Sequence, residues 1–276
     1  MIKLEGNDLK RQANLIRQDI IQMIYEAGSG HPGGSLGMAD IITCLYFHIL
    51  KHDPKNPEDP ERDRLILSNG HICPVLYSAL ARSGYFPVEK LKTLRKFGSG
   101  LQGHPHRGML TGIETTSGPL GSGLSEASGI AWVGKHDKKS WKVICLMSDA
   151  EQDEGNTWEG AMFASKYQLD NLIALIDRNN IQVDGTTDEV MPLDPLKEKY
   201  QAFGWNVQEI DGHNFEAIID AFEKAKNNIS KKPTLIIAKT ILGKGVSFME
   251  NQVEWHSKVI NKEDYEKAMR ENGAEK

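Results

Sequence analysis

Residues 142–180 read KVICLMSDAEQDEGNTWEGAMFASKYQLDNLIALIDRNN and contain two apolar runs of strand length, 143–147 and 172–176. An acidic loop and a helical stretch, 157–167, separate them. A strand, a helix and a second strand in this order predict a right-handed crossover that brings two parallel strands side by side. The runs end in Ser148-Asp149 and in Asp177-Arg178-Asn179-Asn180, so polar groups follow strands that are apolar enough to be buried.

The rest of the chain extends this alternation. Further strands are predicted at 65–67, 205–210 and 234–238, and further helices at 9–24, 38–50, 193–203 and 215–226. Alternating strands and helices indicate an α/β fold with a parallel sheet and helices on both faces. Because no repeat, low-complexity segment or Pro/Ser-rich linker divides the chain, we expect 1–276 to be a single domain. The last stretch, 261–276, is expected to form a solvated helix.

The composition narrows the class of protein. The chain has 276 residues, 39% of them hydrophobic, and a formal net charge of −5 with Lys and Arg scattered along it, so nucleic acid is not an expected partner. Three widely spaced cysteines indicate neither a disulfide framework nor a metal site. No signal peptide and no apolar run of about 20 residues is present. We therefore expect a cytoplasmic protein that does not bind membranes.

Polar side chains follow the two strands of the opening stretch at one edge of the predicted sheet. In an open parallel sheet, ligands bind beyond the carboxyl ends of the strands, where Asp149 and Asn179 are expected to lie close together. Carboxylate and amide oxygens suit Mg²⁺ bound together with a diphosphate. Taken singly, Asp149 is more typical of a helix cap, and Asn179 of a turn, than of a metal site. An EF-hand is excluded, because Glu154 stands where its loop needs Gly and Gly160 where it needs a bidentate Glu.

Glycine-rich segments with histidines form the second pattern. SGHPGGSLGMA (29–39), RDRLILSNGH (62–71), GHP (103–105) and TTSGPLGSGL (115–124) follow one another along the chain. Glycine lets a ligand approach the backbone closely, and a neutral imidazole can donate to or accept from it near pH 7. TTSGPLGSGL does not follow an apolar strand, which argues against a dinucleotide-binding loop.

These segments resemble those of transketolases in order and spacing, and residues 142–180 resemble the transketolase version of the thiamine diphosphate motif, Gly-Asp-Gly followed further along by Asn. The resemblance implies the thiamine diphosphate-binding fold of the diphosphate-binding domain. It also implies that Asp149, Asn179 and the carbonyl of Ile181 hold Mg²⁺, with Ca²⁺ or Mn²⁺ able to substitute. Ser148 and Ala150 replace both motif glycines, and Ala150 lacks the access of glycine to positive φ.

The resemblance also implies roles for the other site residues. His31 and His104 would contact the hydroxyls of the sugar donor, and His256 would touch both the diphosphate and the substrate; these three are the expected catalytic residues. Glu154 would pair with a carboxylate of a partner subunit. The residues expected to bind the cofactor are His71, Gly118, Pro119, Leu120, Asp149, Ala150, Glu154, Asn179, Ile181 and His256. The histidines without a match are expected to be structural or exposed: His48, His52, His106, His136 and His213.

The resemblance covers about 9–256 and corresponds to the first domain of a longer transketolase. The glutamate that activates the cofactor and the residues that hold the sugar phosphate belong to the pyrimidine-binding domain, which is expected with the C-terminal domain on a partner chain. The resemblance therefore implies the N-terminal subunit of a split transketolase in a heterotetramer of two copies of each subunit. Such an enzyme transfers a two-carbon ketol unit from a ketose phosphate to an aldose phosphate.

Other functions remain open at this point. The chain could be the alpha subunit of a 2-oxo-acid dehydrogenase or half of a deoxyxylulose phosphate synthase, although SNGHICPVLYSAL and GPLGSG favour transketolase. It could also be a non-catalytic subunit that binds the cofactor. A Mg²⁺-dependent phosphohydrolase using Asp149 would leave the histidine segments unexplained. Pentose phosphate, sulfosugar and branched-sugar pathways are all compatible with the sequence.

Overall fold

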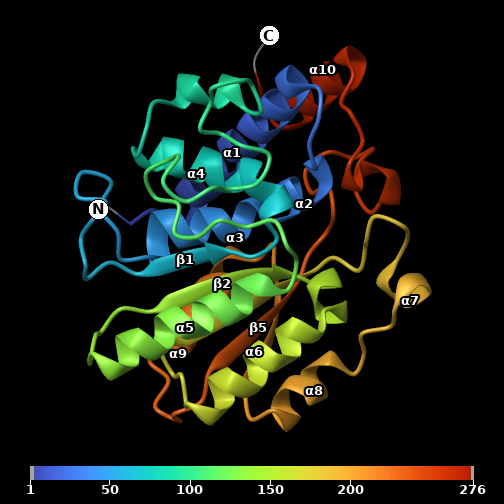
Figure 1. The fold of residues 1–276 in the computed structure, drawn as a ribbon. Coiled ribbons are helices and arrows are strands. Elements are labelled where there is room, and N and C mark those ends of the chain that lie inside the picture. Colours follow the sequence, from blue (N-terminus) through green and yellow to red (C-terminus); the bar gives the residue numbers. More distant parts are fainter. Residues whose placement is uncertain (1–2, 275–276) are drawn as a thin grey trace.

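The computed structural model describes residues 3–274 and has one parallel sheet (Figure 1). The order of the strands across the sheet is β1-β2-β3-β5-β4. Every neighbouring pair is parallel, and the register of β2 against β3 pairs Ser148 with Asp177. The predicted α/β fold is confirmed, with each predicted strand found to within two residues at its ends. The strands are β1 (Arg64–Leu67), β2 (Val143–Ser148), β3 (Leu172–Arg178), β4 (Asn206–Asp211) and β5 (Thr234–Lys239).

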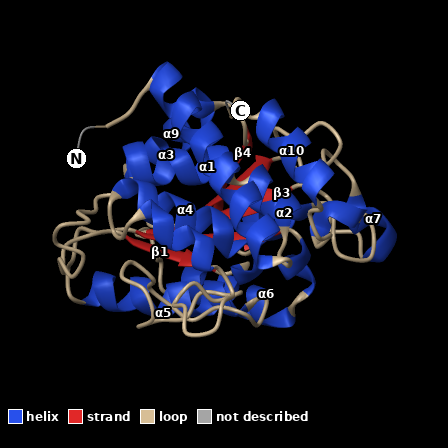
Figure 2. Cartoon of the chain, turned by 90° about the horizontal axis from the view of Figure 1, so that it is seen from above, coloured by secondary structure: helices blue, strands red, loops and turns tan. Residues whose placement is uncertain are grey.

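Helices cover both faces of this sheet, as expected (Figure 2). One face is covered by α1 (Gly6–Ala27), α3 (Ala39–Cys44), α4 (Cys73–Ser83) and α9 (Phe215–Lys226), and the other by α5 (Ser122–His136), α6 (Gly155–Lys166) and α8 (Leu196–Ala202). The remaining α-helices are α2 (Pro32–Gly37), α7 (Thr187–Val190) and α10 (Lys262–Glu271). Among residues 3–274, no helix combines the length and the apolar character needed to cross a membrane.

Burial on both faces explains the unbroken apolar runs of the central strands. In β2, Ile144 and Leu146 pack toward α1 and its neighbours, whereas Val143, Cys145 and Met147 pack toward α5 and α6. Side chains of a strand alternate between faces, so a strand covered on both sides is apolar throughout. The edge strand β4 is covered less completely, and its side chains are partly exposed.

Two predicted helices differ from the structure. The helix predicted at 38–50 consists of α3 followed by one π-helical turn, Leu45–Ile49. The C-terminal helix is not simply solvated, because α10 packs on α1: the rings of Tyr25 and Tyr265 stack with centroids 4.4 Å apart, and Ala268 is buried. Residues 275–276 of that predicted helix lie outside the described residues.

A buried ionic cluster fixes the segment after β5. Asp40 of α3 accepts hydrogen bonds from Arg17 Nη2 (2.7 Å) and from His213 Nδ1 (2.8 Å), while His213 Nε2 accepts from the amide of Ile241 (2.9 Å). Although burial opposes it, these bonds hold the pKa of Asp40 below its ordinary value. Leu242, the next residue along the chain, packs tightly on Gly33 of α2. A Cβ atom on Gly33 would lie only 2.6 Å from the Cγ of Leu242. His213 therefore has the structural role expected of it.

Candidate active site

Asp149 lies directly beyond the carboxyl end of β2. Its Oδ1 accepts a hydrogen bond from the amide of Ala150 (2.8 Å) and its Oδ2 from the amide of Asn180 (2.7 Å), so the side chain bridges the ends of β2 and β3. Burial raises the pKa of this 1% exposed carboxyl to about 6, even though both bonds and the nearby Arg178 lower it. Arg178 is a weak counter-ion, with Nη1 3.6 Å from Oδ2. A bound cation would compensate the buried charge.

Asn179 follows β3 and is held in one orientation. Its Oδ1 accepts from the amide of Ile181 (2.9 Å), and its Nδ2 donates to Asp177 Oδ2 (3.0 Å). Asp177 is buried and also accepts a hydrogen bond from Thr240, at the end of β5. Burial, together with the charge of Asp149, raises the pKa of Asp177 to about 7. The sequence interpretation missed this role of Asp177, although a carboxylate ending an apolar strand could have indicated it.

Three oxygens that follow β2 and β3 are of the kind that a hard cation prefers. They are the carboxylate of Asp149, the amide oxygen of Asn179 and the carbonyl of Ile181, which accepts no hydrogen bond from the residues that the structure describes. Within 3–274, no three His, Cys, Asp or Glu side chains are grouped so as to hold a metal by themselves. A Mg²⁺ ion at this place would therefore complete its shell with water and with phosphate oxygens.

Replacement of the two motif glycines is accommodated without backbone strain. Ala150 begins a 3₁₀ turn, Ala150–Asp153, and neither Ala150 nor Ser148 has a positive φ. The amide of Ser148 donates to Glu151 Oε2 (2.8 Å), and its hydroxyl lies within hydrogen-bonding distance of both that oxygen and the amide of Glu151. The Ser148 hydroxyl thus adds contacts within this turn that a glycine could not make.

Glu151 joins three segments at the buried centre of this edge. Besides Ser148, it accepts hydrogen bonds from the hydroxyl of Ser68, just after β1, and from the amide of Gly121 (2.9 Å), just before α5. Gly121 has φ 77°, and a Cβ there would lie 2.6 Å from that of Glu154. The carboxylate thereby fixes the loop 118–121 against the diphosphate motif. Sequence reasoning did not identify Glu151.

Three histidines from distant segments meet at the same edge. The ring centroids of His31 and His71 are 5.0 Å apart, those of His31 and His256 5.6 Å, and those of His71 and His256 5.5 Å. Burial, followed by the charges of the neighbouring histidines, lowers the pKa of His31 to about 4 and that of His71 to about 3. The pKa of His256 is also lowered by burial. All three are neutral near pH 7, and Nδ1 of His31 and of His256 are buried without a hydrogen-bond partner.

The other predicted residues lie around this cluster. His104 is exposed and lines a pocket together with Arg95, whose Nη1 donates to Ser29 Oγ, two residues before His31. Leu120 is 37% exposed, an apolar side chain at the surface beside Glu151 and its loop. The loop residues Gly118 and Pro119 are accessible, and Glu154 is exposed at the N-terminal end of α6. The structure thus brings the predicted site residues to one edge of the sheet.

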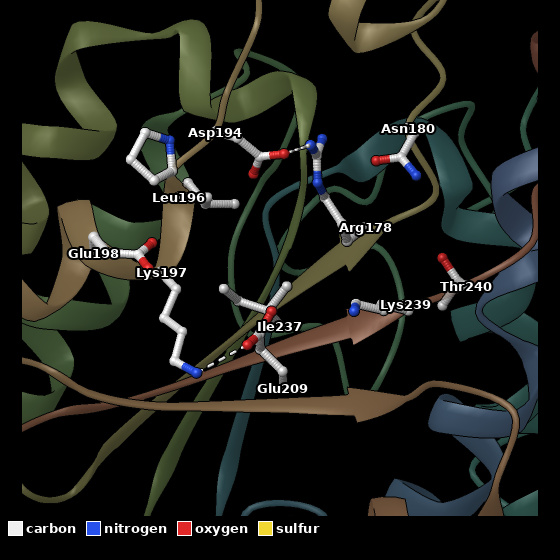
Figure 3. A pocket seen from close by; sticks show the side chains of 11 residues that line it. Arg178, Asn180, Asp194, Leu196, Lys197, Glu198, Glu209, Ile237, Lys239 and Thr240 are labelled. Atoms are coloured by element: carbon white, nitrogen blue, oxygen red, sulfur yellow. Dashed lines mark hydrogen bonds and ion pairs between the residues drawn. The ribbon is translucent and has the colours of Figure 1, made fainter.

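A separate pocket of about 530 Å³ adjoins the ends of β3 and β5 (Figure 3). Arg178 and Asp194 face one another across it at 3.5 Å, and Lys197 pairs with Glu209 at 2.9 Å. The predicted site residues do not line it. Arg178 lines this pocket and also contacts Asp149, with Nη1 3.6 Å from Oδ2.

Replacing Asp177 with Ala should weaken Mg²⁺ binding roughly 10- to 100-fold, the usual effect of losing a residue that orients a metal ligand. Asn179 Nδ2 would lose its acceptor, and the amide would no longer be held with Oδ1 toward the metal. Titration calorimetry with Mg²⁺ in the presence of inorganic diphosphate measures this. Asp220→Ala on the exposed side of α9 is the control. Unchanged Mg²⁺ affinity in a folded Asp177→Ala protein would contradict the assignment.

The buried histidines should make stability depend on pH. Since the pKa of His71 falls from 6.5 in the unfolded chain to about 3, the unfolded state binds more protons below pH 6.5, and stability decreases as pH falls. Between pH 7 and pH 5, the wild type should lose up to about 2 kcal/mol more than His71→Gln. Urea unfolding of both proteins at the two pH values tests this, and equal losses would show that His71 is not held neutral.

Comparison with known proteins places this geometry in a family. Residues 9–276 match the family described as transketolase, thiamine diphosphate binding domain. The chain is 46% identical to the 6-deoxy-6-sulfo-D-fructose transketolase subunit of a Clostridium species, over 96% of each chain. It is 43% identical to an apulose-4-phosphate transketolase subunit of Phocaeicola vulgatus, over 97% of this chain and 95% of that one.

A crystal structure of transketolase from Campylobacter jejuni superposes with a TM-score of 0.92 and 38% identity. That match covers 98% of this chain but 43% of the Campylobacter protein, and the human transketolase is likewise matched over 42% of its length at 39% identity. The expected resemblance to transketolases and the expected enzyme class are confirmed. The matched family, relatives and structure are transketolases and not the other thiamine enzymes considered above. The chain belongs to the transketolase family and corresponds to its thiamine diphosphate-binding domain.

Proposed function

We propose that this chain is the diphosphate-binding subunit of a two-chain transketolase. With a second chain that carries the pyrimidine-binding and C-terminal domains, it would transfer a two-carbon ketol unit from a ketose phosphate to an aldose phosphate. The observation that carries the proposal is the meeting of Asp149 and Asn179 with three neutral histidines at one edge of the sheet. Two relatives matched over nearly their whole length are named as transketolase subunits, which supports the division into two chains.

The chain would contribute binding and orientation. Asp149, Asn179 and the Ile181 carbonyl would hold Mg²⁺, with Ca²⁺ or Mn²⁺ able to replace it, and the amide of Ala150 would meet the diphosphate of the cofactor. Thiamine diphosphate, when bound, supplies the nucleophilic carbon and the electron sink for exchange of the carbon–carbon bond. The proposed roles of the histidines follow from their neutral state near pH 7.

Neutral imidazoles can both donate and accept, so His31 and His104 would orient the donor hydroxyls. The Nδ1 atoms of His31 and His256, which have no hydrogen-bond partner in the structure, would form hydrogen bonds with a ligand that fills the site. His71 would lie near the diphosphate, while Leu120 would pack against the rings of the cofactor. Glu154 would pair with a carboxylate of the partner subunit, and its exposed position beside Gly121 supports this role.

Substrates, pathway and compartment belong to the same proposal. We propose that the enzyme works in the cytoplasm, in the pentose phosphate pathway. The relatives named for sulfofructose and for apulose-4-phosphate show that subunits of this kind serve other sugars as well.

The test is to recover the chain with its partner from cell extract and assay ketol transfer with added thiamine diphosphate and Mg²⁺. Transfer of a two-carbon unit by the complex, and by neither chain alone, is the expected result. Asp149→Ala should abolish Mg²⁺-dependent retention of the cofactor, and with it the activity, because the metal would lose its charged ligand. A complex that retains the cofactor but forms no product from any donor would indicate a non-catalytic subunit instead.

We further propose a heterotetramer of two copies of each subunit, with contact between the copies through an aromatic face on α5 and α6. Exposed apolar side chains gather there, namely Trp132, Val133, Met162, Phe163 and Tyr167. The rings of Phe163 and Tyr167 lie 4.5 Å apart, and those of Trp132 and Tyr167 6.3 Å apart, so the side chains form one patch. Exposed apolar patches of this kind favour association.

Phe163→Glu should break this contact, because a charge would have to be buried in an apolar interface. Sedimentation velocity of the purified two-subunit complex should then show a species of about half the mass. Ile229→Glu, which also places a carboxylate at an exposed apolar position but in the loop before β5, should leave the mass unchanged. A full-size complex with Phe163→Glu would place the contact elsewhere.

A further inference from the structure

A basic pocket lies beside the histidines. It has a volume of about 320 Å³ and is lined by Arg95, Lys96, Ser99, Leu101, Gln102, Gly103 and His104. Two of these side chains are cations and none is a carboxylate. Among residues 3–274, moreover, no carboxylate lies within ion-pair distance of Arg95 or Lys96. In a protein with a net charge of −5, an uncompensated basic pocket is suited to an anion.

Arg95 is held in place by two segments, the loop around 101–103 and Ser29. Its amide donates to the carbonyl of Leu101 (2.8 Å), and its backbone has φ 59°, a left-handed conformation that residues other than glycine seldom adopt. Its Nη1 donates to Ser29 Oγ (3.2 Å), two residues before His31. A Cβ on Gly103 would lie 3.0 Å from its Nε, so the absence of a side chain at 103 makes room for the guanidinium.

The pocket shares one residue, His104, with the proposed substrate site. His104, expected to contact a donor hydroxyl, lines it, and Ser29 ties Arg95 to the loop that carries His31. The charge of Arg95 contributes, after burial, to the lowered pKa of both His31 and His104. A substrate with a hydroxyl at His104 could therefore bring an anionic group to Arg95 in the same pocket.

We infer that Arg95, with Lys96 and Ser99, forms a subsite for a tetrahedral oxyanion, the terminal phosphate or sulfonate of a sugar substrate. The inference rests on the proposed function and adds a phosphate- or sulfonate-binding group to this chain, in addition to those expected on the partner. A guanidinium bonded to Ser29 through one N–H keeps other donors free, in the planar arrangement that suits two oxygens of such an anion. The pocket volume of about 320 Å³ is several times the roughly 30 Å³ that a water molecule occupies in the liquid, so a phosphate or sulfonate group fits in the pocket.

The first test is direct binding to the full chain without its partner. Inorganic phosphate would be titrated into ¹⁵N-labelled protein while the Arg95 Nε–Hε signal is followed by NMR. Wild type should bind phosphate, and Arg95→Gln should bind it at least about tenfold more weakly, the cost of a lost charge-assisted hydrogen bond. Lys92→Gln, an exposed position with the same change in charge, should retain wild-type affinity. Equal affinity for Arg95→Gln and wild type would overturn the inference.

The second test uses the complex of both subunits. Arg95→Gln should raise KM for a phosphorylated aldehyde acceptor at least about tenfold while leaving the kinetics with glycolaldehyde, which has no anionic group, unchanged. Equal losses with both acceptors would show a structural role and overturn the subsite. Absence of ketol transfer in the wild-type complex would refute the proposed function but leave the binding result valid. Titration with methanesulfonate in place of phosphate shows which oxyanion the pocket prefers, and failure of both to bind would overturn the inference.

Discussion

One buried carboxylate determines how the site is built. Glu151 accepts hydrogen bonds from Ser68, Gly121 and Ser148, which come from the end of β1, the loop before α5 and the end of β2. A carboxylate has only acceptors, so donors must approach it from every side, and in a buried position each donor left without it would be costly. Hydrogen bonds to an ionised group are also stronger than neutral ones. The ends of two strands and the loop 118–121 therefore keep fixed positions, and the other site residues are placed relative to them.

The sequence predicts the sheet well because its strands are buried on both faces, where an apolar run identifies a strand directly. It also predicts Asp149 and Asn179, since consecutive parallel strands end at one edge. Glu151 and Asp177 were missed because their roles depend on contacts distant in sequence: Ser68 is 83 residues from Glu151, and Thr240 is 63 residues from Asp177. The meeting of three histidines from separate loops came from a family resemblance. No spacing within a helix or a strand connects them.

At the two replaced glycines, side-chain hydrogen bonds stabilise the loop conformation. Glycine at these positions would allow a positive φ, but here the backbone of Ser148 and Ala150 needs none. The turn is instead stabilised by side chains: the Ser148 hydroxyl lies beside the amide of Glu151, and the side chain of Gln152 donates to the carbonyl of Ser148 (3.1 Å). Ala150 retains the backbone amide that a glycine would have. The departure from the motif therefore changes how the loop is held while keeping the amide of Ala150, which donates to Asp149 Oδ1 (2.8 Å).

Three electrostatic environments lie next to one another along this edge, and their order suits the proposed reaction. The strand ends hold a buried, under-compensated carboxylate at Asp149, where a cation would be stabilised. The histidine cluster beside it is kept neutral, because three mutually close rings cannot all carry charge away from water. Beyond His104, the loop of Arg95 is cationic. A substrate with an uncharged reacting end and an anionic tail would meet matching potentials only when its reacting end faces the histidines. Charge placement within this one chain would therefore favour one orientation of such a substrate.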